Sequence, residues 1–424
     1  MAESNKQSIR GDRLSNLPDD VLLRILSLLP SSHDSIRTSC LSSRFRHLWK
    51  SVPILDCRDN LCRANTFEAF MNNVLHNHEL RVWKFRLQVY DYTCIPNSVY
   101  NWIHRFTEAS SLNLEELHIH VPLYVRDRHV NLPGAVFSCP RLKNLRLIGG
   151  LRIDNIPSDV GFPCLKTLKL ISVSLVGNPN LNNLLSSAVC PMLETFHIEN
   201  CSIEVIEQIG DNNIHKTFVI KYIRGTMGEI SDYCSSNQLS TVDSAPNMDP
   251  TFMFLKMIKK VKQLEISYAD MSQFVELISK EYNQPVFKNL RHLVVKDCRY
   301  VDTLSLLLKH SPNLTSLVLE EFELMTDDEP EAAASFTKCL LWNLETIQII
   351  IKNSYMTTNE VEVVKQFLKN ALVLKKLVLC VQRGSTDHEM KTSILSQPRA
   401  STQCDIEFHS NKSLIDGQGI GIVY

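Results

Sequence analysis

A recurring hydrophobic pattern constrains this chain more than any other feature. From about Val82 onward the sequence repeats L-x-x-L-x-L, with aliphatic or aromatic substitutions. The clear copies begin at Leu114, Leu142, Leu165, Leu193, Val261, Leu290, Leu314, Leu344 and Leu374, and weaker copies fit at Val82, His215 and Leu239. The mean spacing from Leu114 to Leu374 is about 26 residues. Each L-x-L predicts a short strand whose alternate side chains point inward, and the rest of each unit returns the chain.

A spacing of about 20 to 29 residues is typical of leucine-rich repeats, whose stacked units share one continuous core. The length of 424 residues is also too great for one ordinary compact core. Prolines shortly before several strands favour an extended entry; they follow Cys139, Phe162, Cys190 and Ser311. We therefore predict an α/β fold in which residues 80–335 form a parallel sheet, an irregular leucine-rich-repeat solenoid of the α/β horseshoe type.

The segment 11–57 is different in kind and predicts three short helices. Pro18 stands near a first helical position, and Asp19 and Asp20 favour the helix N-terminus. Apolar residues then recur at helical spacing, at Val21, Leu22, Ile25, Leu26 and Leu29. A second helix carries Ile36, Cys40 and Leu41, and a third carries Phe45, Leu48 and Trp49. So small a module either leaves apolar surface for a partner or caps the rest of the chain.

Residues 12–30 and 37–49 resemble a plant-type F-box. In that family the Leu-Pro turn and the apolar helix faces dock on the Skp adaptor, which links to a cullin/RING scaffold. The resemblance implies adaptor contacts at Leu17, Pro18, Leu22, Ile25, Leu26, Leu41, Phe45 and Trp49. Two departures stand out: Phe45 occupies a position that is usually Trp, and the loop before Arg37 is one residue longer than the commonest form.

The C-terminal segment, residues 336–412, reads as a strand, a helix, a strand and a tail. A capping box at Thr357 and Glu360 precedes a helical face made of Val361, Val364, Phe367 and Leu368. By itself this pattern is typical of a last repeat followed by a cap. The order of its strand, helix and second strand also resembles the FBD segment of plant F-box proteins. That resemblance implies capping and target contact. Residues 1–10 and 413–424 are expected to be tails.

The positions between the inward leucines should line the exposed face of the sheet. They are His118, Arg146, Lys169 and His197 in the first half, and Glu265, Val294, Val318, Gln348 and Val378 in the second. We hypothesise that a target protein is read on this concave face, with the valines as an apolar anchor and the basic stretch selecting acidic features. The alternative is that the chain's own loops cover Val294, Val318 and Val378.

Composition and motifs argue against other classes of function. Lys and Arg number 45 against 46 Asp and Glu, which leaves no positive surplus for nucleic acid. The polar start and the lack of a long apolar run indicate neither secretion nor membrane insertion, so we expect a cytoplasmic or nuclear protein. No Cys-x-x-Cys pair, phosphate loop, H-E-x-x-H or G-x-S-x-G motif occurs, so no metal, cofactor or catalytic residue is expected. The thirteen cysteines should be reduced and mostly buried.

Together the three regions resemble an F-box/leucine-rich-repeat protein with an FBD segment. The resemblance implies a non-catalytic subunit that selects substrates for an SCF-type ubiquitin ligase, leading to ubiquitination and proteasomal degradation. Two alternatives remain: a leucine-rich-repeat interaction scaffold whose F-box no longer binds the adaptor, and an enzyme assembled from dispersed histidines and cysteines.

Overall fold

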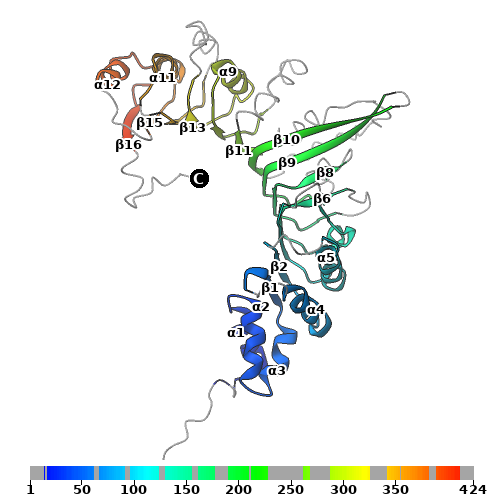
Figure 1. Cartoon of the computed structure of the whole chain (residues 1–424). Helices are drawn as coiled ribbons and strands as arrows, with labels where there is room; N and C mark the ends of the chain where they lie inside the picture. The colour runs from blue at the N-terminus through cyan, green and yellow to red at the C-terminus, as the bar shows by residue number, and fades with distance from the viewer. Residues whose placement is uncertain are drawn as a thin grey trace, which may run out of the picture. The chain divides into compact units, whose positions relative to one another are not determined.

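The structure is a computed structural model in which the chain divides into two units, Met1–Leu193 and Glu194–Tyr424 (Figure 1). It describes residues 14, 17–61, 66–90, 96–123, 129–154, 161–176, 190–209, 212–227, 261–267, 287–324, 341–353, 355–381 and 388–410. The expected tails and the weak repeat copy at Leu239 lie outside these residues.

The first unit begins with three short α-helices, as predicted, and with two 3-10 turns that were not predicted. They are α1 (Asp19–Ser27), α2 (Ser32–Arg37), η1 (Thr38–Cys40), α3 (Phe45–Leu48) and η2 (Trp49–Ser51). Pro18 is the N-cap of α1, and Asp19 and Asp20 occupy its first turn, where the helix dipole favours negative charge. Ser31 caps α2 by accepting a hydrogen bond from the backbone N–H of Asp34 at 3.3 Å.

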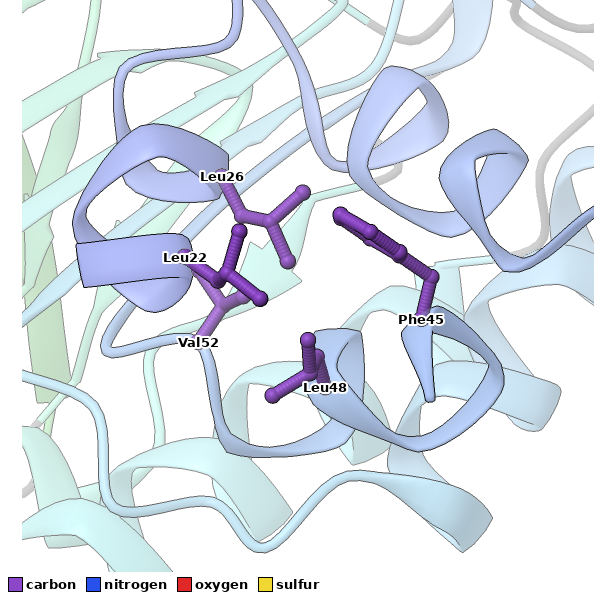
Figure 2. Close-up of a cluster of buried hydrophobic side chains, with 5 residues drawn as sticks. All are labelled: Leu22, Leu26, Phe45, Leu48 and Val52. Atoms are coloured by element: carbon purple, nitrogen blue, oxygen red, sulfur yellow. The ribbon is translucent and has the colours of Figure 1, made fainter. Parts of the chain in front are cut away.

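A small core joins these helices. Five buried side chains meet between α1, α3 and the segment that follows η2: Leu22, Leu26, Phe45, Leu48 and Val52 (Figure 2). Leu17, Leu23 and Leu29 pack around it and remain partly exposed. The module therefore has an interior of its own, although it is too small to be robust alone.

The rest of the first unit is a parallel sheet with returning helices. Its elements are β1 (Ile54–Arg58), η3 (Asp59–Leu61), α4 (Phe67–Asn77), β2 (Lys84–Gln88), α5 (Pro96–Ser110), β3 (Glu116–Val121), β4 (Val130–Asn131), η4 (Gly134–Ser138), β5 (Asn144–Gly149), β6 (Leu151–Ile153), β7 (Thr167–Ile171) and β8 (Ser174–Val176). Strands β1, β2, β3, β5 and β7 pair in parallel in that order. The sheet thus begins at Ile54, inside the segment assigned to the F-box and well before residue 80.

The core of this unit lies between the inward side of the sheet and the helices. Phe85 of β2 stacks on Phe106 of α5 with ring centroids 4.0 Å apart. Phe67 of α4 meets Trp102 of α5 edge to face at 5.6 Å. Burial alternates along β2, β3 and β7, as the repeat pattern predicts.

A repeated backbone contact links successive strands in both units. Before several strands one carbonyl accepts two successive N–H groups at the start of the next strand, as the carbonyl of Glu115 does from Lys143 and Asn144. Thr315 does the same for Glu345 and Thr346. Because each repeat satisfies the polar groups of its neighbour, the period in the sequence becomes a period in hydrogen bonding.

The second unit continues the same architecture after a long hairpin. Its elements are β9 (Thr195–Ile209), β10 (Asn212–Met227), β11 (Val261–Ser267), β12 (His292–Lys296), α9 (Val301–Lys309), β13 (Ser316–Phe322), β14 (Thr346–Ile351), α11 (Thr358–Asn370), β15 (Lys376–Val381), α12 (His388–Leu395) and β16 (Asp405–Ser410). Strands β11 to β16 pair in parallel in chain order. Helices α11 and α12 lie together along one side of the last strands (Figure 1).

The hairpin departs from the predicted pattern. Strand β10 runs antiparallel to both β9 and β11. The expected repeat copy at His215 was therefore wrong, because a repeat strand would run parallel to its neighbours. A hairpin places its two strands next to each other through local pairing, so it can extend without a returning helix.

The C-terminal segment contains the predicted capping box and goes on further than predicted. The Thr357 side chain accepts from the Glu360 N–H, and the Glu360 carboxylate accepts from the Thr357 N–H. Val363 is buried on α11 in place of Val361, which is partly exposed. The last part of segment 336–412, expected to follow the second strand without regular structure, instead forms α12 and β16, and β16 pairs in parallel with β15 over its whole length.

Candidate interaction surfaces

Helix α1 carries a wide apolar stripe of which only one half faces the core. Leu22 and Leu26 are buried, whereas Val21 and Ile25 are exposed. The exposed half is extended at the two ends of α1 by Pro18 and by Leu28, which is 79% exposed. These four positions, the α1 outer face, follow helical spacing. Leu14 and Leu41 are also exposed.

The structure separates the eight predicted adaptor contacts into two groups. Pro18, Ile25 and Leu41 are exposed, and Leu17 is partly so. The other four are buried inside the protein: Leu22, Leu26, Phe45 and Trp49. Sequence reasoning missed Val21 as a surface residue and missed Leu28 entirely. The signal was present, because both continue the spacing of Pro18 and Ile25 along the helix.

Trp49 and its neighbours join the helical module to the first repeat. Trp49 packs near the His78 ring, with centroids 6.3 Å apart. Nε2 of His78 lies 3.0 Å from the carbonyl oxygen of Val52, and its Nδ1 accepts from the N–H of Leu80 at 2.9 Å. Because Nδ1 accepts, Nε2 carries the proton and donates. Burial lowers the pKa of His78 to about 4.

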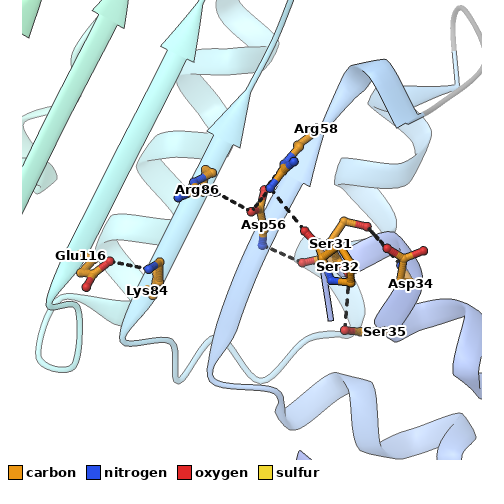
Figure 3. Close-up of polar contacts among 10 residues, drawn as sticks. Ser31, Ser32, Asp34, Ser35, Asp56, Arg58, Lys84, Arg86 and Glu116 are labelled. Atoms are coloured by element: carbon orange, nitrogen blue, oxygen red, sulfur yellow. Dashed lines mark hydrogen bonds and ion pairs between the residues drawn. The ribbon is translucent and has the colours of Figure 1, made fainter. Parts of the chain in front are cut away.

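Polar contacts fasten α2 to the edge strand β1 (Figure 3). The Ser32 hydroxyl accepts from the Asp56 N–H at 2.8 Å, and Arg58 donates to the carbonyl of Pro30 at 3.3 Å. On the sheet face, the Asp56 carboxylate holds Arg58 at 2.7 Å and Arg86 at 3.0 Å. The module is thus fixed to the sheet through several bonds and is more than a tethered extension.

Three predicted target-binding residues do lie together on the exposed face of the first unit's sheet. Five residues from successive strands stand side by side and form what we call the central row: Asp56, Arg86, His118, Arg146 and Lys169. A flanking row contains Lys84, which pairs with Glu116 at 2.7 Å (Figure 3). His197, the fourth predicted residue, belongs to the second unit, where it lies 3.0 Å from Glu199.

The predicted valines are also in register, on the face of the second unit's sheet. We call the following set the valine row: Glu265, Val294, Val318, Gln348, Val378 and Glu407. Val294 and Val318 are partly exposed, whereas Val378 is only 7% exposed. Acidic residues are held by neighbouring lysines, with Glu265 2.7 Å from Lys296 and Glu407 2.8 Å from Lys376. An apolar contact on this face therefore centres on the first two valines.

Reactive chemistry has little support among the described residues. Seven of the nine described cysteines are buried, as expected, and burial raises the pKa of Cys139 and Cys298 to about 12. Within the described part of the chain no group of three His, Cys, Asp or Glu side chains is arranged to hold a metal ion. Nor does any described helix have the length and apolar character needed to cross a bilayer.

The fold and these surfaces define a class of protein: a helical F-box module fastened to a parallel, repeat-built sheet. Comparison with family models agrees region by region. An F-box domain model matches residues 14–56, a model of the LRR repeats of the FBD-associated F-box protein At5g56370 matches residues 99–227, and an FBD model matches residues 334–379.

Curated proteins of Arabidopsis thaliana match along nearly the whole chain. The F-box/FBD/LRR-repeat protein At2g26030 is 26% identical, with 93% of this chain and 98% of that protein covered. The F-box/FBD/LRR-repeat protein At5g56420 is 28% identical, with 94% and 99% covered. The FBD-associated F-box protein At5g22730 is 28% identical, with 93% and 94% covered. Along nearly its whole length the chain is thus similar to F-box/FBD/LRR-repeat proteins.

Proposed function

We propose that this protein is a substrate-recognition subunit of an SCF-type ubiquitin ligase. The F-box would bind a Skp-family adaptor, and through it the cullin/RING scaffold, while the sheet faces bind a target protein for ubiquitination and proteasomal degradation. The observation that carries the proposal is the α1 outer face, an apolar surface left exposed on a module whose core is already complete.

The exposed residues are the adaptor contacts in this proposal. Pro18, Ile25 and Leu41 keep the role expected of them, and Val21 and Leu28 join them. Transfer of one leucine-sized side chain from water into an interface is favourable by about 1.5–3 kcal/mol. Leu22, Leu26 and Phe45 act from inside, by fixing the position of α1.

The same arrangement bears on the two departures from the usual F-box. Phe45 is buried between α1 and α3, so its replacement of the usual Trp changes interior packing and leaves the α1 outer face untouched. The longer loop leads into α2, which is capped by Ser31 and bonded to β1 through Ser32. Both features are compatible with an adaptor-binding F-box. The alternative is an interaction scaffold whose F-box does not bind the adaptor, and the experiment below distinguishes the two.

Such a subunit performs no bond chemistry itself. Its contribution is to hold a target so that a ubiquitin-charged enzyme elsewhere in the complex meets the target's lysines at a high effective concentration. No cofactor is needed for this role. The adaptor and scaffold place the protein in the cytosol or nucleus.

Co-purification tests the proposal. The full chain is co-expressed with a plant Skp adaptor and analysed by size-exclusion chromatography, with Ile25→Glu and Leu28→Glu as test variants. Leu112→Glu is the matched control, because Leu112 is 72% exposed and lies just after α5, outside the F-box. We expect wild type and the control to co-elute with the adaptor and the test variants to lose it. Folded wild-type protein that does not bind would instead favour the interaction scaffold.

A further inference from the structure

The central row has an excess of positive charge. The row and its two flanking rows on β1 to β7 carry Arg58, Lys84, Arg86, Arg146 and Lys169, but only Asp56 and Glu116 as carboxylates. Both carboxylates are already paired, Asp56 with two arginines and Glu116 with Lys84. Arg146 is exposed and forms no ion pair with any described residue. This face therefore attracts anions.

Two cations flank a histidine in this row. Neighbouring strands are about 4.8 Å apart, so the Cα atoms of Arg86 and Arg146 stand roughly 10 Å apart with His118 between them. Arginine side chains are long enough for both guanidinium groups to reach a single ligand group placed above the imidazole ring of His118. The three residues thus stand side by side on β2, β3 and β5, within reach of a common ligand.

Three polar atoms in these residues have no hydrogen-bond partner in the described part of the chain. Nε of Arg86 and both ring nitrogens of His118 are buried and form no hydrogen bond with the described residues. Leaving a buried donor unpaired costs about 1–3 kcal/mol, so each such group in a folded protein calls for an explanation. The Arg86 N–H and the imidazole N–H are donors, and an oxyanion offers only acceptors.

The electrostatic state of His118 fits the same explanation. Its pKa is lowered to about 4, first by burial and then by Arg86 and Arg146, with a smaller contribution from His120. The ring is therefore neutral at physiological pH. A bound anion would offset the two positive charges and make a second N–H on the ring favourable.

We propose that Arg86, His118 and Arg146 bind an oxyanion on an acidic segment of the target protein, either a carboxylate or a phosphoryl group. This inference rests on the proposed function, because it names the chemical class of target that the first unit's sheet face selects. A charge-assisted hydrogen bond from arginine is well suited to both groups.

A peptide fits better than a nucleic acid. The chain carries 45 basic and 46 acidic residues, so there is no overall surplus for a polyanion. On the second unit's sheet the face carries Glu265, Glu320, Asp405 and Glu407 against Lys296 and Lys376. The basic character is thus confined to a short row, which matches a few acidic side chains on an extended segment.

The experiment uses the full chain in complex with the adaptor and three fluorescein-labelled ten-residue peptides. One contains phosphoserines, one contains glutamates at the same positions and one contains glutamines. Fluorescence anisotropy is measured for wild type, Arg146→Gln and the matched control Arg141→Gln. Arg141 is an exposed arginine of the same unit, paired with Glu115 in the turn before β5. Both variants remove one positive charge, but only one alters the central row.

We expect wild type to bind at least one acidic peptide and to ignore the glutamine peptide. Arg146→Gln should weaken binding at least about tenfold, the effect of losing a hydrogen bond to a charged group. Arg141→Gln should stay within about twofold of wild type. Comparing the phosphoserine and glutamate peptides then assigns the oxyanion.

Three results would overturn the inference: no acidic peptide bound at millimolar concentration, equal losses in both variants, or inorganic phosphate binding as tightly as the peptides. Either of the first two results would show that the central row is not a specific binding site for acidic peptides. The third would show that it binds small anions only. Adaptor co-elution is recorded for the same samples. Peptide failure with the adaptor retained refutes this inference alone, whereas a wild-type chain that lacks the adaptor refutes the proposed function.

Discussion

The hydroxyl of Ser32, at the start of the second F-box helix, accepts a hydrogen bond of 2.8 Å from the backbone N–H of Asp56 in the first strand of the sheet. Among the described strands of the first unit β1 pairs with β2 alone, so its other edge would otherwise present unpaired backbone groups. The F-box therefore serves as the N-terminal cap that a repeat array requires, in addition to any adaptor contact.

Replacing Ser32 tests this cap. Ser32→Ala removes the acceptor and leaves the part-buried Asp56 N–H without this partner, so the free energy of unfolding should fall by about 1–3 kcal/mol. Ser111→Ala, at a partly exposed serine after α5, should change it by less than about 0.5 kcal/mol. Urea unfolding followed by circular dichroism measures both. Equal stability of the two variants would show that the bond does not hold the module to the sheet.

Phe45 should matter through packing. Phe45→Ala opens a cavity beside Leu22, Leu26 and Leu48 and should lower the free energy of unfolding by about 3–5 kcal/mol. Phe45→Leu keeps most of the volume and should lower it far less. We expect adaptor binding to follow stability in this pair. Loss of adaptor binding in a fully stable Phe45→Leu protein would instead place the ring at the interface.

Acid should weaken the junction around His78. The folded pKa of His78 is about 4 and its ordinary value is 6.5, so the unfolded chain takes up the proton first as the pH falls. Its contribution to stability, on the order of 3 kcal/mol, is complete above pH 6.5 and is lost between pH 6.5 and 4. Protonation of Nδ1 also breaks its bond from the Leu80 N–H.

Stability against pH, measured by urea unfolding, checks this. His78→Gln should flatten the profile between pH 6.5 and 4, while other histidines with lowered pKa, among them His33 and His118, keep a residual slope. His76→Gln, at an exposed position on α4, should leave the profile like that of wild type. An unchanged slope in the His78→Gln protein would contradict the assignment.

The Glu360 side chain links helix α11, which lies in the segment that the FBD model matches, to the preceding repeat. Its buried carboxylate accepts from the Thr357 N–H at 2.7 Å and from the Leu324 N–H at 3.1 Å. Glu360→Ala leaves both donors unpaired and should destabilise the protein by at least about 2 kcal/mol. Glu362→Ala removes a carboxylate two residues further along α11, at a partly exposed site, and should have little effect. Thermal unfolding distinguishes the two, and similar melting temperatures would argue against the link.

Local patterns predicted much of the fold, because their physical causes are local. The capping box at Thr357 requires only that two side chains meet across one helical turn. The L-x-L strands follow from alternating burial, and Pro18 with its two acids marks the start of α1. The β9–β10 hairpin and the α12–β16 end were missed, because their strands are defined by pairing with neighbours more than by their own sequence.

The sequence by itself determined the resemblance to F-box/FBD/LRR-repeat proteins, the repeat period and the residues of the sheet face, since each follows from the spacing of side chains along the chain. Only the tertiary structure decided which half of the α1 stripe is buried and which exposed, because helical spacing shows that a face is apolar and not what covers it. It likewise brought Arg86 beside His118, a contact between strands more than 30 residues apart that depends on the register of the sheet.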